Sequence, residues 1–197
     1  PLATLKSEAE MALRQAGDEP TRIRLRGMIR ATEESARSAN QLLDHATVLF
    51  RADQNTQERV DLGAMVAALA ERFRPTAHLK DMEIRQHLPA ERLETTGDAV
   101  LIEAALRNLI DNAVKYSPEE SEVSVTLSRD GAFARLELRD RGRGLGGESL
   151  ATLSQRFRRG SNVGGVIGSG LGLTIAQEVA EAHGGKLTLS NLPGGGA

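Results

Sequence analysis

The stretch Asn108-Leu-Ile-Asp-Asn-Ala-Val-Lys-Tyr116 decides how the rest of the chain is interpreted. At helical spacing it places Asn108, Asn112 and Lys115 on one face. Asparagine is a mediocre helix former because its short amide competes for backbone hydrogen bonds. Amide oxygens suit Mg²⁺ and an ammonium suits phosphate, although a plain surface helix with solvated polar side chains is the alternative from this stretch alone. The other flank is apolar: Leu106, Leu109, Ile110 and Ala113.

Composition narrows the class of protein. The chain has 197 residues, of which 40% are hydrophobic and 26% charged, with a net charge of −2. These values predict one or two globular domains, and without a run of like charge we expect no nucleic-acid partner. The absence of cysteine excludes disulfides, thiolate metal sites and cysteine nucleophiles, and is compatible with the cytoplasm. No apolar run reaches membrane-spanning length, so we expect no membrane contact within this sequence.

Two amphipathic segments open the chain. Residues 2–15 place their apolar side chains on one helical stripe, and residues 21–51 repeat an a/d heptad pattern. The short polar stretch 52–57 is the expected domain boundary, so residues 1–57 are predicted to form a helical hairpin. Two such helices cannot cover their own apolar stripes. Pairing with a second copy into a four-helix bundle is therefore expected.

Residues 58–197 mix strands and helices without strict alternation, which makes the overall class α+β and predicts an α/β sandwich for this part. Strands are expected at 60–62, 82–88 and 186–190, and a hairpin with its turn at Asp130-Gly131 is expected to join 123–127 to 134–138. Helices are expected over 63–79, from Gly97-Asp98 to Tyr116, and over 173–182. Residues 89–96 are predicted to form a loop.

Asp140 follows the second strand of the predicted hairpin on its inward side. A carboxylate there is costly to bury unless a donor such as an adenine amino group binds it, although an aspartate that caps a turn is the common alternative. Gly142 and Gly144 would let a flat ring approach the backbone. The run from Gly142 to Gly147 also matches the dinucleotide fingerprint, which we reject because its strand opens no βαβ unit.

A second glycine cluster, Gly168-Ser-Gly170-Leu-Gly172-Leu173, directly precedes a predicted helix. Glycines at a helix N-terminus expose backbone N–H groups at the positive end of the dipole, which favours a phosphate cradle over a flexible loop. No G-K-[ST] follows, so this is not a P-loop. Between the two clusters lies Arg156-Phe-Arg-Arg159. Its arginines are expected either to bind a phosphate group or to form a solvated basic stretch.

Together these motifs resemble the four nucleotide-binding boxes of sensor histidine kinases. Residues 108–116 resemble the N box, Asp140-x-Gly-x-Gly144 the G1 box, Arg156-Phe-x-Arg159 the F box, and residues 168–173 the G2 box, in the order and spacing of the family. The hairpin resembles the dimerisation and phosphotransfer domain. The resemblance covers essentially the whole chain and implies the fold shared by histidine kinases and gyrase-type ATPases for residues 58–197.

The resemblance implies a role for each matching position. Asn112 is expected to bind Mg²⁺, with Asn108 near the metal and the phosphates of ATP, Lys115 on phosphate, and Tyr116 lining the pocket. Asp140 is expected to receive the adenine amino group. Arg159 is expected to approach the phosphates, so that Asn108, Lys115 and Arg159 form the catalytic set. The lid is expected to supply backbone from Gly168, Gly170, Leu171 and Gly172.

Two departures from the family shape the expected function. The acceptor histidine of the family stands five residues before a Pro-Leu pair, and this sequence begins Pro1-Leu2, so we expect the acceptor upstream of it. The last strand of the family would follow Ala197. The expected protein is a kinase core that passes the γ-phosphoryl of ATP to a histidine and on to a response-regulator receiver domain, within an inner-membrane sensor anchored upstream. A serine kinase of the anti-sigma type and a non-catalytic nucleotide-binding scaffold are the alternatives.

Overall fold

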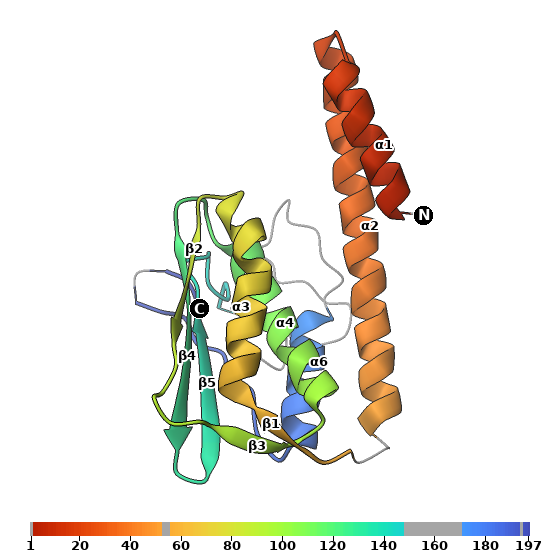
Figure 1. Ribbon diagram of the computed structural model, residues 1–197. Coiled ribbons are helices and arrows are strands. Elements are labelled where there is room, and N and C mark those ends of the chain that lie inside the picture. The colour runs from red at the N-terminus through yellow and green to blue at the C-terminus, as the bar shows by residue number, and fades with distance from the viewer. Residues whose placement is uncertain (1, 53–55, 148–170, 194) are drawn as a thin grey trace.

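The computed structural model describes residues 2–52, 56–147, 171–193 and 195–197. Helices α1 (Leu2–Gln15) and α2 (Glu19–Ala52) form the predicted hairpin, with α1 running beside the first half of the longer α2 (Figure 1). Asp18 begins α2, because its carboxylate accepts a hydrogen bond of 2.9 Å from the Thr21 N–H. Large apolar side chains stay exposed along the hairpin: Leu5, Met11, Ile23, Met28, Leu42, Leu43 and Phe50.

Within the described part of the chain, the remaining elements form two small sheets and three helices. Strands β1 (Glu58–Asp61) and β3 (Glu94–Gly97) pair antiparallel. In the second sheet, β4 (Glu122–Asp130) lies between β2 (Glu83–His87), which is parallel to it, and β5 (Phe133–Arg139), which is antiparallel. The helices are α3 (Leu62–His78), α4 (Ala99–Tyr116) and α6 (Gly172–Ala182).

The main core lies between this second sheet and the helices α3 and α4. Val123, Val125 and Leu127 alternate along β4 and are buried, as their period of two predicts. Val123 and Val125 pack against α3 and α4, where Val66 and Ile110 are almost completely buried. A second core joins α4 and α6 to the C-terminal half of α2 through Val48. The α2 helix therefore packs against α1 with one part of its length and against α4 and α6 with another (Figure 1).

Two expectations about strands were wrong. Residues 94–96, predicted as part of a loop, belong to β3 (Glu94–Gly97), because a short polar segment can be a strand when β1 supplies its hydrogen-bond partners. Residues 186–190, predicted as a strand, form none, although Leu187 and Leu189 are more buried than their neighbours. Their alternation was real, but no neighbouring strand of the described chain pairs with them.

Among the described residues, no helix is both long and apolar enough to cross a lipid bilayer.

Candidate functional site

Helix α4 carries four of the predicted site residues, Asn108, Asn112, Lys115 and Tyr116, and its first turn is fixed by Asp98. The Asp98 carboxylate accepts hydrogen bonds from the backbone N–H groups of Val100 at 2.9 Å and Leu101 at 3.2 Å. These bonds satisfy donors that have no partner inside the helix. Ten residues further on, Asn108 is only 4% exposed, and its Nδ2 donates to the Ala104 carbonyl at 2.8 Å. This bond fixes the amide in one orientation.

The start of α6 lies directly against the two asparagines. A Cβ atom added to Gly172 would lie 3.2 Å from Asn112 Nδ2 and 3.3 Å from Asn108 Oδ1. Glycine at this position therefore permits a close approach that a larger residue would obstruct. The N-terminus of α6, whose first N–H groups make no bond within the helix, thus meets the amide face of α4, which joins two motifs more than fifty residues apart in the sequence.

Of the residues predicted to form the lid, Leu171 and Gly172 lie in the described part of the chain, and Gly168 and Gly170 do not. The Leu171 side chain is fully buried with Ile175 in the core between α4 and α6. This burial keeps the Leu171 side chain away from any ligand, and its expected backbone role stays a prediction. Arg159, Gly168 and Gly170 lie outside the described residues, so their predicted roles stay predictions.

The last turn of α4 presents Lys115 and Tyr116, both half-buried. The Lys115 ammonium lies 5.2 Å from the centre of the Tyr116 ring, within the range of a cation–π contact. The helix ends there because Pro118 follows Ser117, and the Ser117 N–H makes the final bond of the helix to the Ala113 carbonyl at 3.1 Å. A cation and an aromatic ring are therefore held at the same end of the helix.

Asp140 and Gly142 meet this end of α4. The Asp140 carboxylate accepts a hydrogen bond of 2.7 Å from the Gly142 N–H, and a Cβ atom on Gly142 would lie 2.9 Å from the Tyr116 carbonyl oxygen. Burial raises the pKa of Asp140 above its ordinary value, while the hydrogen bonds from the Gly142 and Ala197 N–H groups act in the opposite direction. Within the described residues, these two hydrogen bonds do not fully offset the effect of burial on the Asp140 carboxylate.

A residue that the sequence analysis did not identify holds the loop after β5. Asn191 accepts a hydrogen bond of 2.7 Å from the Leu145 N–H, and its amide lies against Gly144, whose φ of +67° favours glycine. Close by, the Asp140 N–H donates to the Ala197 carbonyl at 2.9 Å. Leu145 and Asn191 are 46 residues apart, and no sequence pattern links them.

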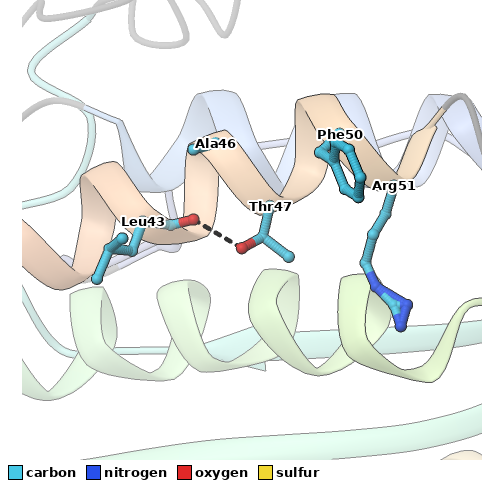
Figure 2. Close-up of a pocket in the computed structure, with 5 residues that line it drawn as sticks. All are labelled: Leu43, Ala46, Thr47, Phe50 and Arg51. Atoms are coloured by element: carbon cyan, nitrogen blue, oxygen red, sulfur yellow. Dashed lines mark hydrogen bonds between the residues drawn. The ribbon is translucent and has the colours of Figure 1, made fainter.

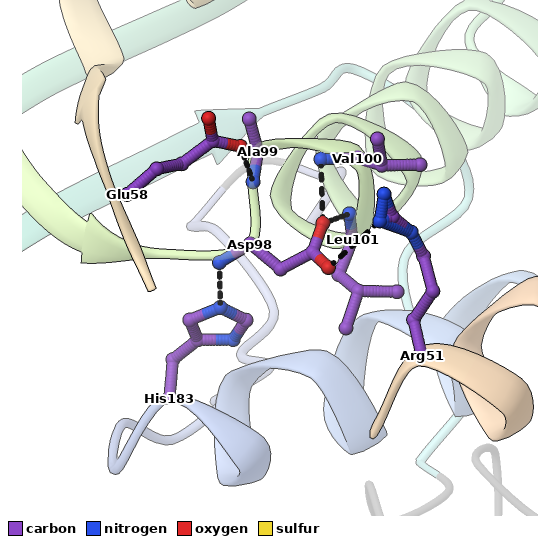
Figure 3. A network of polar contacts seen from close by, with 7 residues as sticks. All are labelled: Arg51, Glu58, Asp98, Ala99, Val100, Leu101 and His183. Atoms are coloured by element: carbon purple, nitrogen blue, oxygen red, sulfur yellow. Dashed lines mark hydrogen bonds and ion pairs between the residues drawn. The ribbon is translucent and has the colours of Figure 1, made fainter. Parts of the chain in front are cut away.

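The C-terminal end of α2 reaches the start of α4 through the polar network of Figure 3. Arg51 Nη1 lies 3.2 Å from Asp98 Oδ2, and the Asp98 N–H donates to His183 Nε2 at 3.0 Å. His183 Nδ1 lies 2.8 Å from the Val179 carbonyl, which makes Nδ1 the protonated nitrogen and Nε2 the acceptor. His183 is thus a structural residue, and the Asp98 carboxylate connects α2 with α4.

Other contacts along the same side of α2 support this arrangement. Asp44 forms an ion pair with Arg107 of α4, and His45 Nε2 lies 3.6 Å from Glu178 Oε2 of α6. Val48 is buried between them. A shallow hollow on α2 is lined by Leu43, Ala46, Thr47, Phe50 and Arg51 (Figure 2). Leu43, Ala46 and Phe50 belong to the predicted heptad stripe, and Arg51 also pairs with Asp98.

The comparisons with known proteins agree with this geometry. Residues 97–197 match the family described as histidine kinase-, DNA gyrase B- and HSP90-like ATPase. The chain is 34% identical to the sensor protein QseC of Escherichia coli K12 over 200 residues, which cover the whole chain but 43% of QseC. The chain therefore spans less than half the length of this curated relative.

Two solved structures are also similar. The cytoplasmic segment of histidine kinase QseC matches with a TM-score of 0.58 and 27% identity, over 80% of this chain and 87% of that one. Full-length ShkA in complex with AMPPNP matches with a TM-score of 0.69 and 25% identity, over 99% of this chain and 43% of that one. The family match supports ATP as the ligand of the site. The family match covers more than half of this chain, which therefore belongs to the histidine kinase-, DNA gyrase B- and HSP90-like ATPase family.

Proposed function

We propose that this chain is the kinase core of a two-component sensor, which binds Mg²⁺-ATP and transfers the γ-phosphoryl group to a histidine outside this sequence. The observation that supports the proposal is the contact of Gly172 with the amides of Asn108 and Asn112. It brings the N-terminus of α6, the positive end of its dipole, beside amide oxygens, a combination suited to phosphates and a hard cation. The similarity to sensor histidine kinases favours this activity over a serine kinase.

The residues near α4 fit the parts of Mg²⁺-ATP. Asn112 is half-exposed and offers an amide oxygen, which suits a cation that keeps several waters and shares phosphate oxygens. Mg²⁺ at this position would neutralise phosphate charge. Lys115 would bind phosphate, Tyr116 would line the base pocket, and Asp140 would accept a hydrogen bond from the adenine amino group. ShkA, which resembles this chain over nearly its full length, was solved with the ATP analogue AMPPNP.

The chemistry available to Asn108 distinguishes phosphoryl transfer from hydrolysis. Its amide is buried, and its nitrogen is committed to the Ala104 carbonyl. An amide cannot take a proton from water, so Asn108 cannot act as a general base. Catalysis would then consist of positioning and charge neutralisation by Lys115 and Arg159, which suits a loose phosphoryl-transfer transition state.

The proposed partners follow from the hairpin. We propose a homodimer in which a second copy covers the exposed heptad side of α2, including the hollow at Leu43 and Phe50 (Figure 2). Arg51, at the edge of this hollow, also pairs with Asp98 at the start of α4, so the proposed dimer contact would lie beside the contact between α2 and α4. A response-regulator receiver domain would take the phosphoryl group from the histidine. We place this part of the protein in the cytoplasm, like the cytoplasmic segment of QseC, with a membrane anchor upstream.

The test replaces Asn112 by alanine and measures binding of AMPPNP in the presence of Mg²⁺ by calorimetry. We expect Asn112→Ala to abolish detectable binding, because the metal loses its one proposed protein ligand, while circular dichroism and dimerisation stay as in the original chain. Asn40→Ala, at an exposed position of α2, serves as the control and should bind normally. An unchanged affinity of Asn112→Ala would refute the metal assignment.

Transfer itself is tested on a longer protein that includes the residues upstream of Pro1. Incubation with [γ-³²P]ATP should label this protein, and the label should be lost in acid, because phosphohistidine is acid-labile. An acid-stable label would support the serine kinase. No label, with nucleotide binding intact, would support the nucleotide-binding scaffold.

A further inference from the structure

Lys80 lies in the turn between α3 and β2, far in sequence from every predicted site residue, yet its side chain ends at the last turn of α4. Its ammonium donates to the Val114 carbonyl at 2.8 Å, the Lys115 carbonyl at 3.3 Å and the Ser117 carbonyl at 2.9 Å. The side chain is half-buried. Lys80 therefore binds the backbone on both sides of Tyr116.

These three carbonyls need an external donor. The last carbonyls of a helix have no partner within it. Inside a helix, the Val114 carbonyl would accept from the nitrogen four residues later, but this nitrogen belongs to Pro118 and carries no hydrogen. Three acceptors require three N–H donors, which the charged ammonium has and a neutral amine lacks. Its positive charge also complements the negative end of the α4 dipole.

The backbone around Lys80 is fixed to the same segment. The Glu120 N–H donates to the Lys80 carbonyl at 3.0 Å, and the Glu83 N–H donates to the Ser121 carbonyl at 3.0 Å. The turn before β2 and the turn after α4 are thus joined by both main chain and side chain. Burial lowers the pKa of Lys80 below its ordinary value, while Glu119 acts in the opposite direction. The Lys80 ammonium is therefore partly removed from water, and its three hydrogen bonds to carbonyl oxygens offset that cost.

We propose that Lys80 is a positioning residue of the nucleotide site, which holds the last turn of α4 so that Lys115 and Tyr116 point at the ligand. This inference rests on the proposed binding of ATP. Lys80 touches no ligand itself and acts through the backbone of these two residues. The contact of the Tyr116 carbonyl with Gly142 extends the same effect to the loop that begins at Asp140.

The experiment compares Lys80→Met with Arg72→Met. Arg72 also connects α3 with α4, by an ion pair of 3.0 Å to Glu103, but away from the last turn. Both variants remove one positive charge. Lys80→Gln, which keeps two donors, serves as a milder variant if Lys80→Met folds poorly.

Hydrogen exchange in the ligand-free chain gives the first readout. We expect Lys80→Met to speed exchange in residues 113–118 by about tenfold, the effect of losing charge-assisted hydrogen bonds, and Arg72→Met to leave it unchanged. Lys80→Gln should lie between the original chain and Lys80→Met. Unchanged exchange at this segment in both Lys80 variants would overturn the proposal.

Affinity for AMPPNP with Mg²⁺ gives the second readout, and it separates positioning from plain stabilisation. We expect Lys80→Met to raise the Kd about tenfold, and to add little in a chain that already carries Lys115→Met, because residues that act through one another are not additive. Equal affinity of Lys80→Met and the original chain, or fully additive effects, would overturn the inference. Failure of the original chain to bind AMPPNP would instead refute the proposed function, and the exchange result would still decide what Lys80 does to the helix end.

Discussion

Two aspartates lie near opposite ends of α4, and their surroundings differ in kind. Asp98, at the start of the helix, is 3% exposed and binds two backbone N–H groups and the Arg51 guanidinium. Asp140, beside the last turn, is half-buried and accepts hydrogen bonds from the Gly142 and Ala197 N–H groups. Among the described residues, no cation pairs with Asp140. One carboxylate is fully compensated and the other is not.

This difference separates a structural from a functional use of the same side chain. A buried carboxylate with a cation and two hydrogen bonds holds its neighbours in place. A half-buried carboxylate with a raised pKa carries an unmet demand for a donor, which is typical of ligand sites. We therefore predict that the start of α4 serves stability and that Lys115, Tyr116 and Asp140, at its other end, serve binding. Replacing each aspartate should show the difference.

The largest expected effect is at Asp98. Asp98→Ala removes the helix cap and leaves the Arg51 guanidinium without its partner, so we expect the free energy of unfolding to fall by about 2–4 kcal/mol. Urea denaturation measures it. Asp61→Ala is the matched control, because Asp61 caps α3 by one bond of 3.0 Å to the Ala64 N–H and its ion-pair partner is exposed. That variant should lose about 1 kcal/mol. Equal losses would mean that the contacts of Asp98 with α2 add nothing.

A smaller effect is expected at Arg51, which supplies the cation from α2. Arg51→Met should lower the free energy of unfolding by about 1–2 kcal/mol, because Asp98 keeps its two N–H donors but loses its opposite charge. Arg26→Met, which breaks an exposed pair of 3.4 Å with Glu19 on the same helix, should cost about 0.5 kcal/mol or less.

A double-mutant cycle with Asp98→Asn shows whether Arg51 acts through Asp98. We expect a coupling free energy of about 1 kcal/mol between the two substitutions, the scale for residues in direct contact. A coupling near zero would assign the effect of Arg51 to its packing on α2 rather than to the carboxylate.

The sequence predicts the elements whose side chains repeat with a clear period. The hairpin of α1 and α2, the helix α4 and the pair β4–β5 were confirmed, because a stripe or an alternation is visible in a single segment. Strand β3 and the absence of a strand at 186–190 depend on which backbone lies alongside. That information is in the fold and not in either segment.

The same distinction applies to the site. Asn108, Asn112 and Asp140 could be found because side-chain chemistry and local spacing single them out. Lys80, Arg51 and Asn191 could not, because their partners lie 34 to 47 residues away. A lysine in a turn, an arginine at a helix end and an asparagine in a loop are ordinary on the surface of a protein. Only the fold shows that Lys80 and Asn191 bind groups next to predicted site residues, and that Arg51 binds the cap of α4.

The smallest effect on stability is expected at Asp140, and it has the opposite sign. Asp140→Asn keeps an oxygen that can accept from Gly142 but removes the charge that burial disfavours. The free energy of unfolding at pH 7 should therefore stay equal or rise by about 0.5 kcal/mol, as for a half-exposed position. The Kd for AMPPNP with Mg²⁺ should rise about tenfold, because the adenine amino group loses a charged acceptor. A clear loss of stability in Asp140→Asn would mean that Asp140, like Asp98, has a structural role, and would contradict the difference that we infer between the two aspartates.

The pH dependence of stability follows from the sign of the pKa change. The pKa of Asp140 is higher in the folded than in the unfolded chain, so the folded state takes up the proton first as the pH falls. Above its folded pKa the carboxylate is charged in both states and the fold bears the full cost of burial. That cost disappears as the pH falls from the folded pKa through the ordinary carboxyl range. The advantage of Asp140→Asn in urea denaturation should therefore be present at pH 7 and vanish below about pH 4, where both states are protonated. A bound nucleotide should remove the cost in another way, by donating a hydrogen bond to the charged form, and so shift the window to lower pH.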